Sequence, residues 1–124
     1  MTNPTPARHP FLDDLTLDAE LVSTILRKPV SGRETVKRVV EAVGTFYKSQ
    51  TPTFFESAGA RKLLQYDAVL GNGLTIHGTV VIERNPDGGV PRVSVTFSPL
   101  GAALSLAGRL GALLDKDLGE GLFL

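Results

Sequence analysis

The sequence predicts an α+β domain in which a curved antiparallel sheet is packed by an amphipathic helix and a C-terminal helix. Residues 52–98 alternate between strand-forming and turn-forming segments, which is typical of a meander of four antiparallel strands. A helical pattern of apolar residues precedes this meander, and a second one follows it. With 124 residues, of which 42% are hydrophobic, the chain can form one core, so we expect a single domain.

Composition predicts the domain boundaries and the compartment. Residues 1–12 contain three prolines and are expected to form a mobile N-terminal arm, followed by the folded domain at 13–115 and a C-terminal tail at 116–124. The first residues do not resemble a secretory signal. The longest apolar segment, 99–114, is interrupted by glycines and is shorter than the ~20 residues that span a bilayer. We therefore expect a cytoplasmic protein that does not bind a membrane.

Charge and composition also argue against several kinds of partner. Basic and acidic residues both number 13, so the net charge is zero and offers no attraction to nucleic acid. The chain has no cysteine, and its two histidines, His9 and His77, are far apart in the sequence. A metal site built on thiolates or histidines is therefore not expected. We expect no cofactor, no metal and no nucleic-acid partner.

The elements before the meander follow from local pattern. From residue 14, apolar and polar residues alternate, which predicts a half-buried strand over 14–21. Ser31 and Glu34 have the spacing of a capping box, which predicts the start of a helix. The helix is expected over 32–48, with an apolar stripe that ends at Tyr47.

The meander and the last helix complete the expected order of elements. Strands are predicted at 54–57, 62–70, 74–84 and 90–97, with turns at Gly59, at 71–73 and at 85–89. Gly78, in the middle of a strand, indicates a bulge or a close approach of another group. A helix is predicted from Pro99 to about Leu114 and is apolar around most of its circumference. Such a helix needs cover from two sides, so we expect a homodimer.

Several of these segments resemble a known family. Residues 13–17, 29–33, 76–84 and 95–100 are similar to the corresponding parts of the SnoaL-like branch of the nuclear-transport-factor-2-like superfamily. The resemblance covers roughly residues 11–114, and it implies a cone-like fold, usually dimeric, with a sheet curved around a pocket. Many relatives carry an acidic residue two positions after the glycine that matches Gly78, whereas this chain has Val80 there.

The candidate catalytic residues are His77 and Tyr66. Reactions hosted by this superfamily need a carboxylate or histidine base opposite a hydrogen-bond donor in a dry pocket. If the turn at 71–73 is a two-residue loop, Tyr66 faces Thr79 and is a diagonal neighbour of His77. Both candidates would then share one face of the sheet, with His77 as the base and Tyr66 as the donor.

Seven further residues have expected roles. The expected ligand-binding residues are Tyr47, Val80, Thr79 and Thr96. Glu56 and Asp67 are interpreted as solvated or dimer-rim carboxylates. Arg33 is interpreted as exposed or structural, since no acidic or phosphate partner can be named for it.

Three functions remain open from the sequence. The first is a small dimeric protein that binds an apolar or weakly polar small molecule in the hollow of its sheet, without clear catalytic machinery. The second is a polyketide-cyclase-like or ketosteroid-isomerase-like enzyme that uses His77 and Tyr66. The third is a structural or partner-binding module that uses the apolar final helix and has no cavity.

Overall fold

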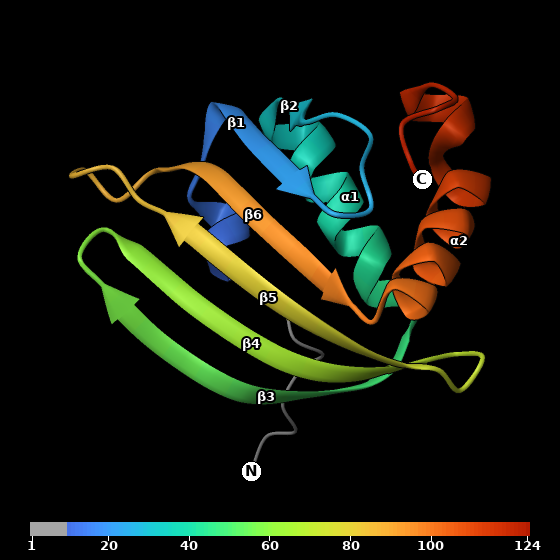
Figure 1. The fold of residues 1–124 in the computed structure, drawn as a ribbon. Helices are drawn as coiled ribbons and strands as arrows, with labels where there is room; N and C mark the ends of the chain where they lie inside the picture. Colours follow the sequence, from blue (N-terminus) through green and yellow to red (C-terminus); the bar gives the residue numbers. More distant parts are fainter. Residues whose placement is uncertain (1–9) are drawn as a thin grey trace, which may run out of the picture.

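The computed structural model describes residues 10–124, and residues 1–9 of the predicted arm at 1–12 lie outside the described residues (Figure 1). A short 3-10 helix, η1, precedes the sheet. The elements in chain order are η1 (Pro10–Asp13), β1 (Leu15–Ser23), β2 (Val30–Ser31), α1 (Arg33–Thr45), β3 (Tyr47–Ala58), β4 (Arg61–Leu70), β5 (Thr75–Glu83), β6 (Val90–Ser98) and α2 (Leu100–Leu118).

The strands form one sheet of six strands in the order β2-β1-β6-β5-β4-β3. The sheet is curved and open, α1 lies across its hollow side, and α2 lies at one end (Figure 1). The predicted α+β class is confirmed. One detail differs, because β1 pairs in parallel with β6 and the sheet is therefore mixed. Parallel pairing requires a long connection, here α1 and the other meander strands, and local alternation carries no signal for it.

The first helix is shorter than predicted. It ends at Thr45, and Tyr47 already pairs with Leu70 of β4, so that the residues predicted as its last turn begin β3 instead. The backbone N–H of Gly71 donates to the carbonyl of Phe46, which extends this pairing to the residue before β3. β3 is correspondingly longer than the predicted strand at 54–57. Two register shifts near Ser49 and Pro52 interrupt its alternation and hide it from sequence analysis.

The predicted capping box does not form at the start of α1. The N-cap residue is Gly32, at φ 103°, and no side chain caps the helix. Ser31 instead pairs with Glu20 in the β1–β2 ladder. Gly32 is suited to this corner because its φ lies in a region that residues with a Cβ rarely adopt.

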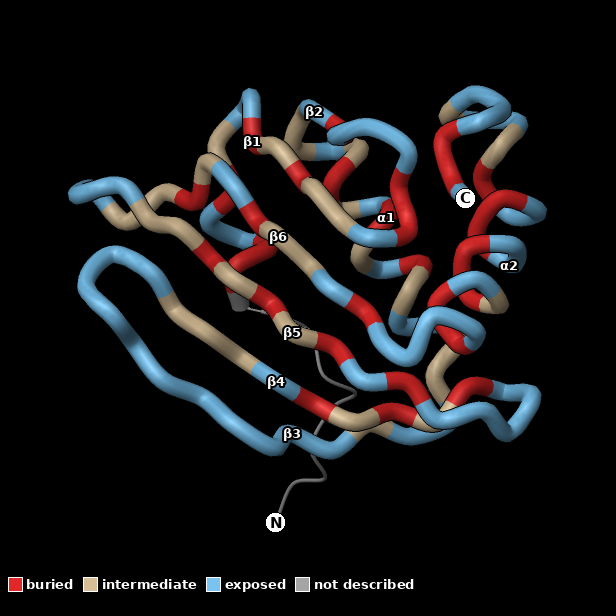
Figure 2. The backbone as a smooth tube through the Cα atoms, viewed as in Figure 1, coloured by how far each residue is buried: buried red, intermediate tan, exposed pale blue. Residues whose placement is uncertain are grey.

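The core lies between the hollow side of the sheet and the two helices, and buried positions alternate along β5 (Figure 2). Both ends of the described chain contribute to it. Phe11 and Leu12 of η1 are 3% and 2% exposed, and Leu122 and Phe123 of the C-terminal tail are 5% and 6% exposed. The packed domain therefore extends beyond the boundaries 13–115 that the sequence suggested.

Candidate functional site: a hollow between α1 and the sheet

A hollow of about 890 Å³ lies between α1 and the concave face of the sheet. Its mouth is open to solvent. The residues that line it are mostly apolar and come from η1, β1, the loop after β1, α1 and strands β3 to β6. They are Phe11, Leu12, Leu21, Ser23, Ile25, Leu26, Val39, Val40, Glu41, Val43, Gly44, Thr45, Tyr47, Lys48, Ser49, Gln50, Pro52, Tyr66, Val80, Val95 and Phe97.

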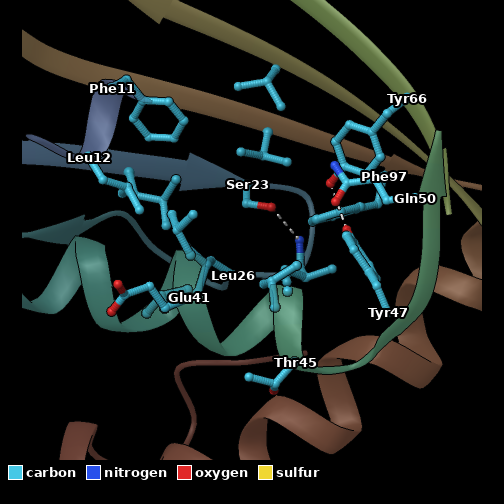
Figure 3. Close-up of a pocket in the computed structure, with 18 of the residues that line it drawn as sticks. Phe11, Leu12, Ser23, Leu26, Glu41, Thr45, Tyr47, Gln50, Tyr66 and Phe97 are labelled. Carbon is cyan, nitrogen blue, oxygen red and sulfur yellow. Dashed lines mark hydrogen bonds between the residues drawn. The ribbon is translucent and has the colours of Figure 1, made fainter. Parts of the chain in front are cut away.

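A pair of tyrosines forms the polar end of the hollow. The hydroxyl oxygens of Tyr47 on β3 and Tyr66 on β4 are 2.6 Å apart, and one hydroxyl donates a hydrogen bond to the other. The ring centroids are 5.7 Å apart, with the rings tilted by 59°. Figure 3 shows the two side chains pointing toward each other. They lie at the opposite end of the hollow from Phe11 and Leu12. Of the two hydroxyl protons, one is shared between the tyrosines and the other can serve a ligand.

Gly78 makes room for one of these tyrosines. Tyr66 pairs with Gly78 across β4 and β5, and its ring lies close against the glycine. A Cβ at position 78 would stand 2.5 Å from Cζ and 2.7 Å from the hydroxyl oxygen of Tyr66. The sequence predicted a bulge or the close approach of another group at Gly78, and the group that approaches is the ring of Tyr66.

Burial keeps both tyrosines neutral. It raises the pKa of Tyr66 to about 12, and the hydrogen bond with Tyr47 partly offsets the rise. The pKa of Tyr47 is also raised, first by burial and then by the proximity of Tyr66. The pair therefore keeps its hydroxyl groups protonated well above physiological pH, where an ordinary tyrosine begins to ionise.

The hollow contains no buried charge. No Asp, Glu, His, Lys or Arg side chain is buried anywhere in the part of the chain whose burial is described, residues 11–124. The charged residues that line the hollow, Glu41 and Lys48, are exposed. In the same residues, no cluster of three or more possible ligands could hold a metal ion.

The predicted face shared by His77 and Tyr66 is wrong. The loop at 71–73 closes between Leu70 and Leu74, whose backbone groups are hydrogen-bonded at 2.8 Å, so it has three residues rather than two. Gly73 adopts φ 89° within it. This one-residue difference pairs His77 with Asp67 rather than with Ala68 and turns it to the outer face of the sheet, away from the hollow.

The other expected ligand-binding residues divide between the two faces. Tyr47 and Val80 line the hollow, as the sequence analysis placed them. Thr79 and Thr96 face each other on β5 and β6 and lie on the outer face with His77. The expected placement of Thr79 followed from the same incorrect loop length, whereas that of Thr96 followed from the alternation of its own strand. The alternation of Ile76, Val80 and Ile82 is the signal that identifies the true inner face of β5.

The structure also places the three charged residues to which the sequence analysis gave no role in the site. Asp67 bonds to His77 on the outer face, and Glu56 is exposed on the edge strand β3. Arg33 donates from Nε to the carbonyl of Leu15, at 2.8 Å, and so ties α1 to β1. None of the three lines the hollow.

Sequence analysis missed part of the lining. Gln50 belongs to the half of β3 that was predicted as helix or left unassigned, and Phe11 lies in the predicted arm. Phe97 was recognised only as part of an alternating strand. The alternation of Phe97 with Ser94, Thr96 and Ser98 indicates that its side chain points to the opposite face of the sheet from theirs. It does not indicate which of the two faces is hollow.

Solved structures of other proteins share this fold. A steroid delta-isomerase from Pseudomonas aeruginosa has a TM-score of 0.78 at 22% identity, over 86% of this chain and 79% of that chain. A bacterial protein with a cystatin-like fold from Silicibacter pomeroyi has a TM-score of 0.79 at 20% identity, over 86% and 75%. A protein of the SnoaL-like family from Agrobacterium tumefaciens has a TM-score of 0.56 at 13% identity, over 72% and 78%. No protein-family model matches the sequence, and no curated protein matches it.

The chain therefore has the nuclear-transport-factor-2-like fold, which SnoaL-like and ketosteroid-isomerase-like proteins share. The resemblance seen in the sequence is confirmed at the level of the fold. Identities of 13% to 22% establish the fold alone, so the chemistry must be argued from the site. Within residues 10–124, neither helix combines the length and the apolarity needed to cross a membrane.

Proposed function

We propose that this protein binds a small, predominantly apolar molecule in the hollow between α1 and the sheet. The observation that carries the proposal is the hollow itself, whose volume of about 890 Å³ falls in the range of small-molecule sites. Apolar surface dominates its lining, and burying such surface of a ligand contributes roughly 25 cal/mol per Å². A neighbour with this fold is named a steroid delta-isomerase, and a steroid is a molecule of this apolar kind.

The chemistry of the lining favours binding over catalysis. The hydroxyl groups of Tyr47 and Tyr66 form a hydrogen-bonding end, and Gln50 lies on the same strand as Tyr47. Proton abstraction next to a carbonyl would need a base in a dry pocket, and no buried carboxylate or histidine is present among residues 11–124, since the carboxylate that lines the hollow, Glu41, is exposed to solvent. A joint role for His77 and Tyr66 is not part of this proposal, since they lie on opposite faces of the sheet.

Gly44 provides a matched pair of variants to test the proposal. It lines the hollow from α1, and a Cβ there would meet no atom within 4 Å. Gly44→Trp should project a large side chain into the open space, whereas Gly44→Ala adds one methyl group and improves helix propensity. Binding of the neutral dye Nile red would be measured by fluorescence titration for the wild type and both variants.

We expect the wild type and Gly44→Ala to bind the dye with similar affinity, and Gly44→Trp to bind at least about tenfold more weakly, which is about 1.4 kcal/mol. The melting temperature of each variant shows whether the fold is retained. Failure of the wild-type protein to bind, or equal binding by the tryptophan variant, would contradict the proposal.

We further propose that the protein forms a homodimer through α2. Leu100, Leu104 and Leu113 are 71%, 46% and 52% exposed, which supports the idea that another surface covers this helix. Light scattering coupled to gel filtration should show a dimer for the wild type and a monomer for Leu104→Glu. Leu17→Glu, at a leucine of β1 that is 76% exposed, is the matched control and should remain a dimer. A monomeric wild type would refute the proposal.

A further inference from the structure

A row of polar residues crosses the outer face of the sheet, opposite the hollow. Asp67 on β4 pairs with His77 on β5, and His77 pairs in turn with Ser98 on β6. Residues paired directly across antiparallel strands point to the same face, with Cβ atoms about 4.5 to 5.5 Å apart. An acid, a base and a hydroxyl therefore stand side by side on three neighbouring strands.

The acid and the base of this row are already joined. Nδ1 of His77 donates a hydrogen bond to Oδ1 of Asp67. A histidine that carries its proton on Nδ1 has a free lone pair on Nε2, which can take a proton from a hydroxyl. The side chains of His77 and Asp67 are 51% and 49% exposed, so a molecule in solution can reach them.

Ser98 has the environment of an available nucleophile. It is exposed at the end of β6, and within residues 10–124 its hydroxyl makes no hydrogen bond, to His77 or to another group, so the contact with Nε2 of His77 has to form when an ester binds. The next residue, Pro99, is the N-cap of α2, and no side chain caps this helix. The first N–H groups of the 19-residue helix, at Leu100 and Gly101, have no intrahelical acceptor and are directed toward its N-terminal end. Such groups stabilise a negative oxygen that forms beside them.

A small polar depression adjoins the row. Its volume is about 240 Å³, and it is lined by Asp67 and His77 together with Thr53, Gln65 and Thr79. Tyr66 and Gly78 complete the lining. The side-chain amide of Gln65 donates to the hydroxyl of Thr79 at 3.2 Å. The depression is several times smaller than the hollow and suits a short acyl group rather than a large apolar molecule.

We propose that Ser98, His77 and Asp67 form a second site on the outer face, at which Ser98 accepts an acyl group from an activated ester. The Ser98 oxygen attacks the carbonyl carbon while Nε2 of His77 takes its proton, and Asp67 holds the resulting imidazolium. The N–H groups of Leu100 and Gly101 face the oxyanion. The bond to the leaving alkoxide then breaks, and the alkoxide takes the proton from His77, which leaves acyl-Ser98 and an alcohol. Water, deprotonated by His77, releases the carboxylic acid and restores the serine.

The test is labelling of the full-length protein with an alkyl fluorophosphonate, which attaches covalently to an activated serine and releases fluoride. The modified residue is identified by mass spectrometry of peptides, and the labelling rate is followed by the mass of the intact protein. The variants are Ser98→Ala, His77→Ala and Asp67→Asn. Ser94→Ala is the matched control, because Ser94 lies on the same face of β6 but pairs with Val81 instead of a histidine.

We expect the wild type and Ser94→Ala to be labelled at Ser98 at equal rates and Ser98→Ala to remain unlabelled. His77→Ala should slow labelling at least about tenfold, since a positioned base typically contributes 10²-fold or more, and Asp67→Asn should also slow it. Circular dichroism of each variant shows that the fold is retained. No label on Ser98, or labelling of His77→Ala at the wild-type rate, would overturn the proposal. Neither result affects the proposal about the hollow.

Discussion

Replacing Gly78 with alanine is expected to force the ring of Tyr66 out of its place, because the new Cβ would stand 2.5 Å from Cζ and 2.7 Å from both Cε2 and the hydroxyl oxygen. Carbon atoms in contact prefer separations of about 3.5 to 4.0 Å, so the ring must move by roughly 1 Å. The clash is with atoms of a ring rather than with a flexible end, and Tyr66 is only 3% exposed.

The magnitude follows from two effects. Overpacking in a core costs about 1 to 3 kcal/mol. A shift of about 1 Å also disrupts the 2.6 Å hydrogen bond between Tyr66 and Tyr47, which adds about 1 kcal/mol. The expected loss of unfolding free energy is therefore about 2 to 4 kcal/mol. Urea denaturation monitored by circular dichroism measures it, and Gly71→Ala is the matched control, because a Cβ at position 71 meets nothing within 4 Å.

A double-mutant cycle isolates the contact. In a Tyr66→Ala background the ring is absent, so Gly78→Ala should cost much less than it does in the wild type. If Gly78→Ala proves as mild as Gly71→Ala, or if its cost is the same in both backgrounds, the argument that Gly78 exists to accommodate Tyr66 is refuted.

Two further predictions concern the tyrosine pair and the C-terminal tail. The sequence has two tyrosines and no tryptophan, so the ultraviolet absorbance of tyrosinate reports Tyr47 and Tyr66 directly, and neither should ionise near pH 10 while the protein is folded. Because the folded pKa of Tyr66 is raised to about 12, its contribution to stability is complete below pH 10 and is lost as the pH rises through 12, by about 2 to 3 kcal/mol. By pH 11 about half of this loss, roughly 1.4 kcal/mol relative to pH 8, is expected and is measured by urea denaturation. The loss should shrink in the Tyr47→Phe, Tyr66→Phe double variant, and an undiminished loss would show that other groups cause it. Although its backbone bridge with Leu26, a residue that lines the hollow, is retained, Phe123→Ala should destabilise the protein by about 3 to 5 kcal/mol in the same assay, because the side chain of Phe123 is 6% exposed. It should also weaken dye binding, whereas Leu124→Ala, at a residue 42% exposed, should change neither property, and equal effects of the two variants would contradict a role for Phe123 in supporting Leu26.

The sequence by itself determined the class of fold and the order of its elements, because the signals for these are local. Alternation marks strands, a 3.6-residue period marks helices, and glycines mark tight turns. Gly59, Gly73 and Gly88 stand in the predicted turns with φ of 62°, 89° and 91°, values that glycine adopts readily. Tyr47, Tyr66 and Val80 were also recognised as candidates for the site from their place in these patterns.

Only the tertiary structure decided which residues share the hollow. The loop at 71–73 is compatible in sequence with two or three residues, and the choice rests on burying Ile76, Val80 and Ile82 on the same face as Tyr66. That choice sends His77 to the outer face, because a shift of one residue reverses every side chain of a strand. The parallel pairing of β1 with β6 and the packing of η1 and the tail likewise depend on contacts between segments far apart in the chain, about which no local pattern carries information.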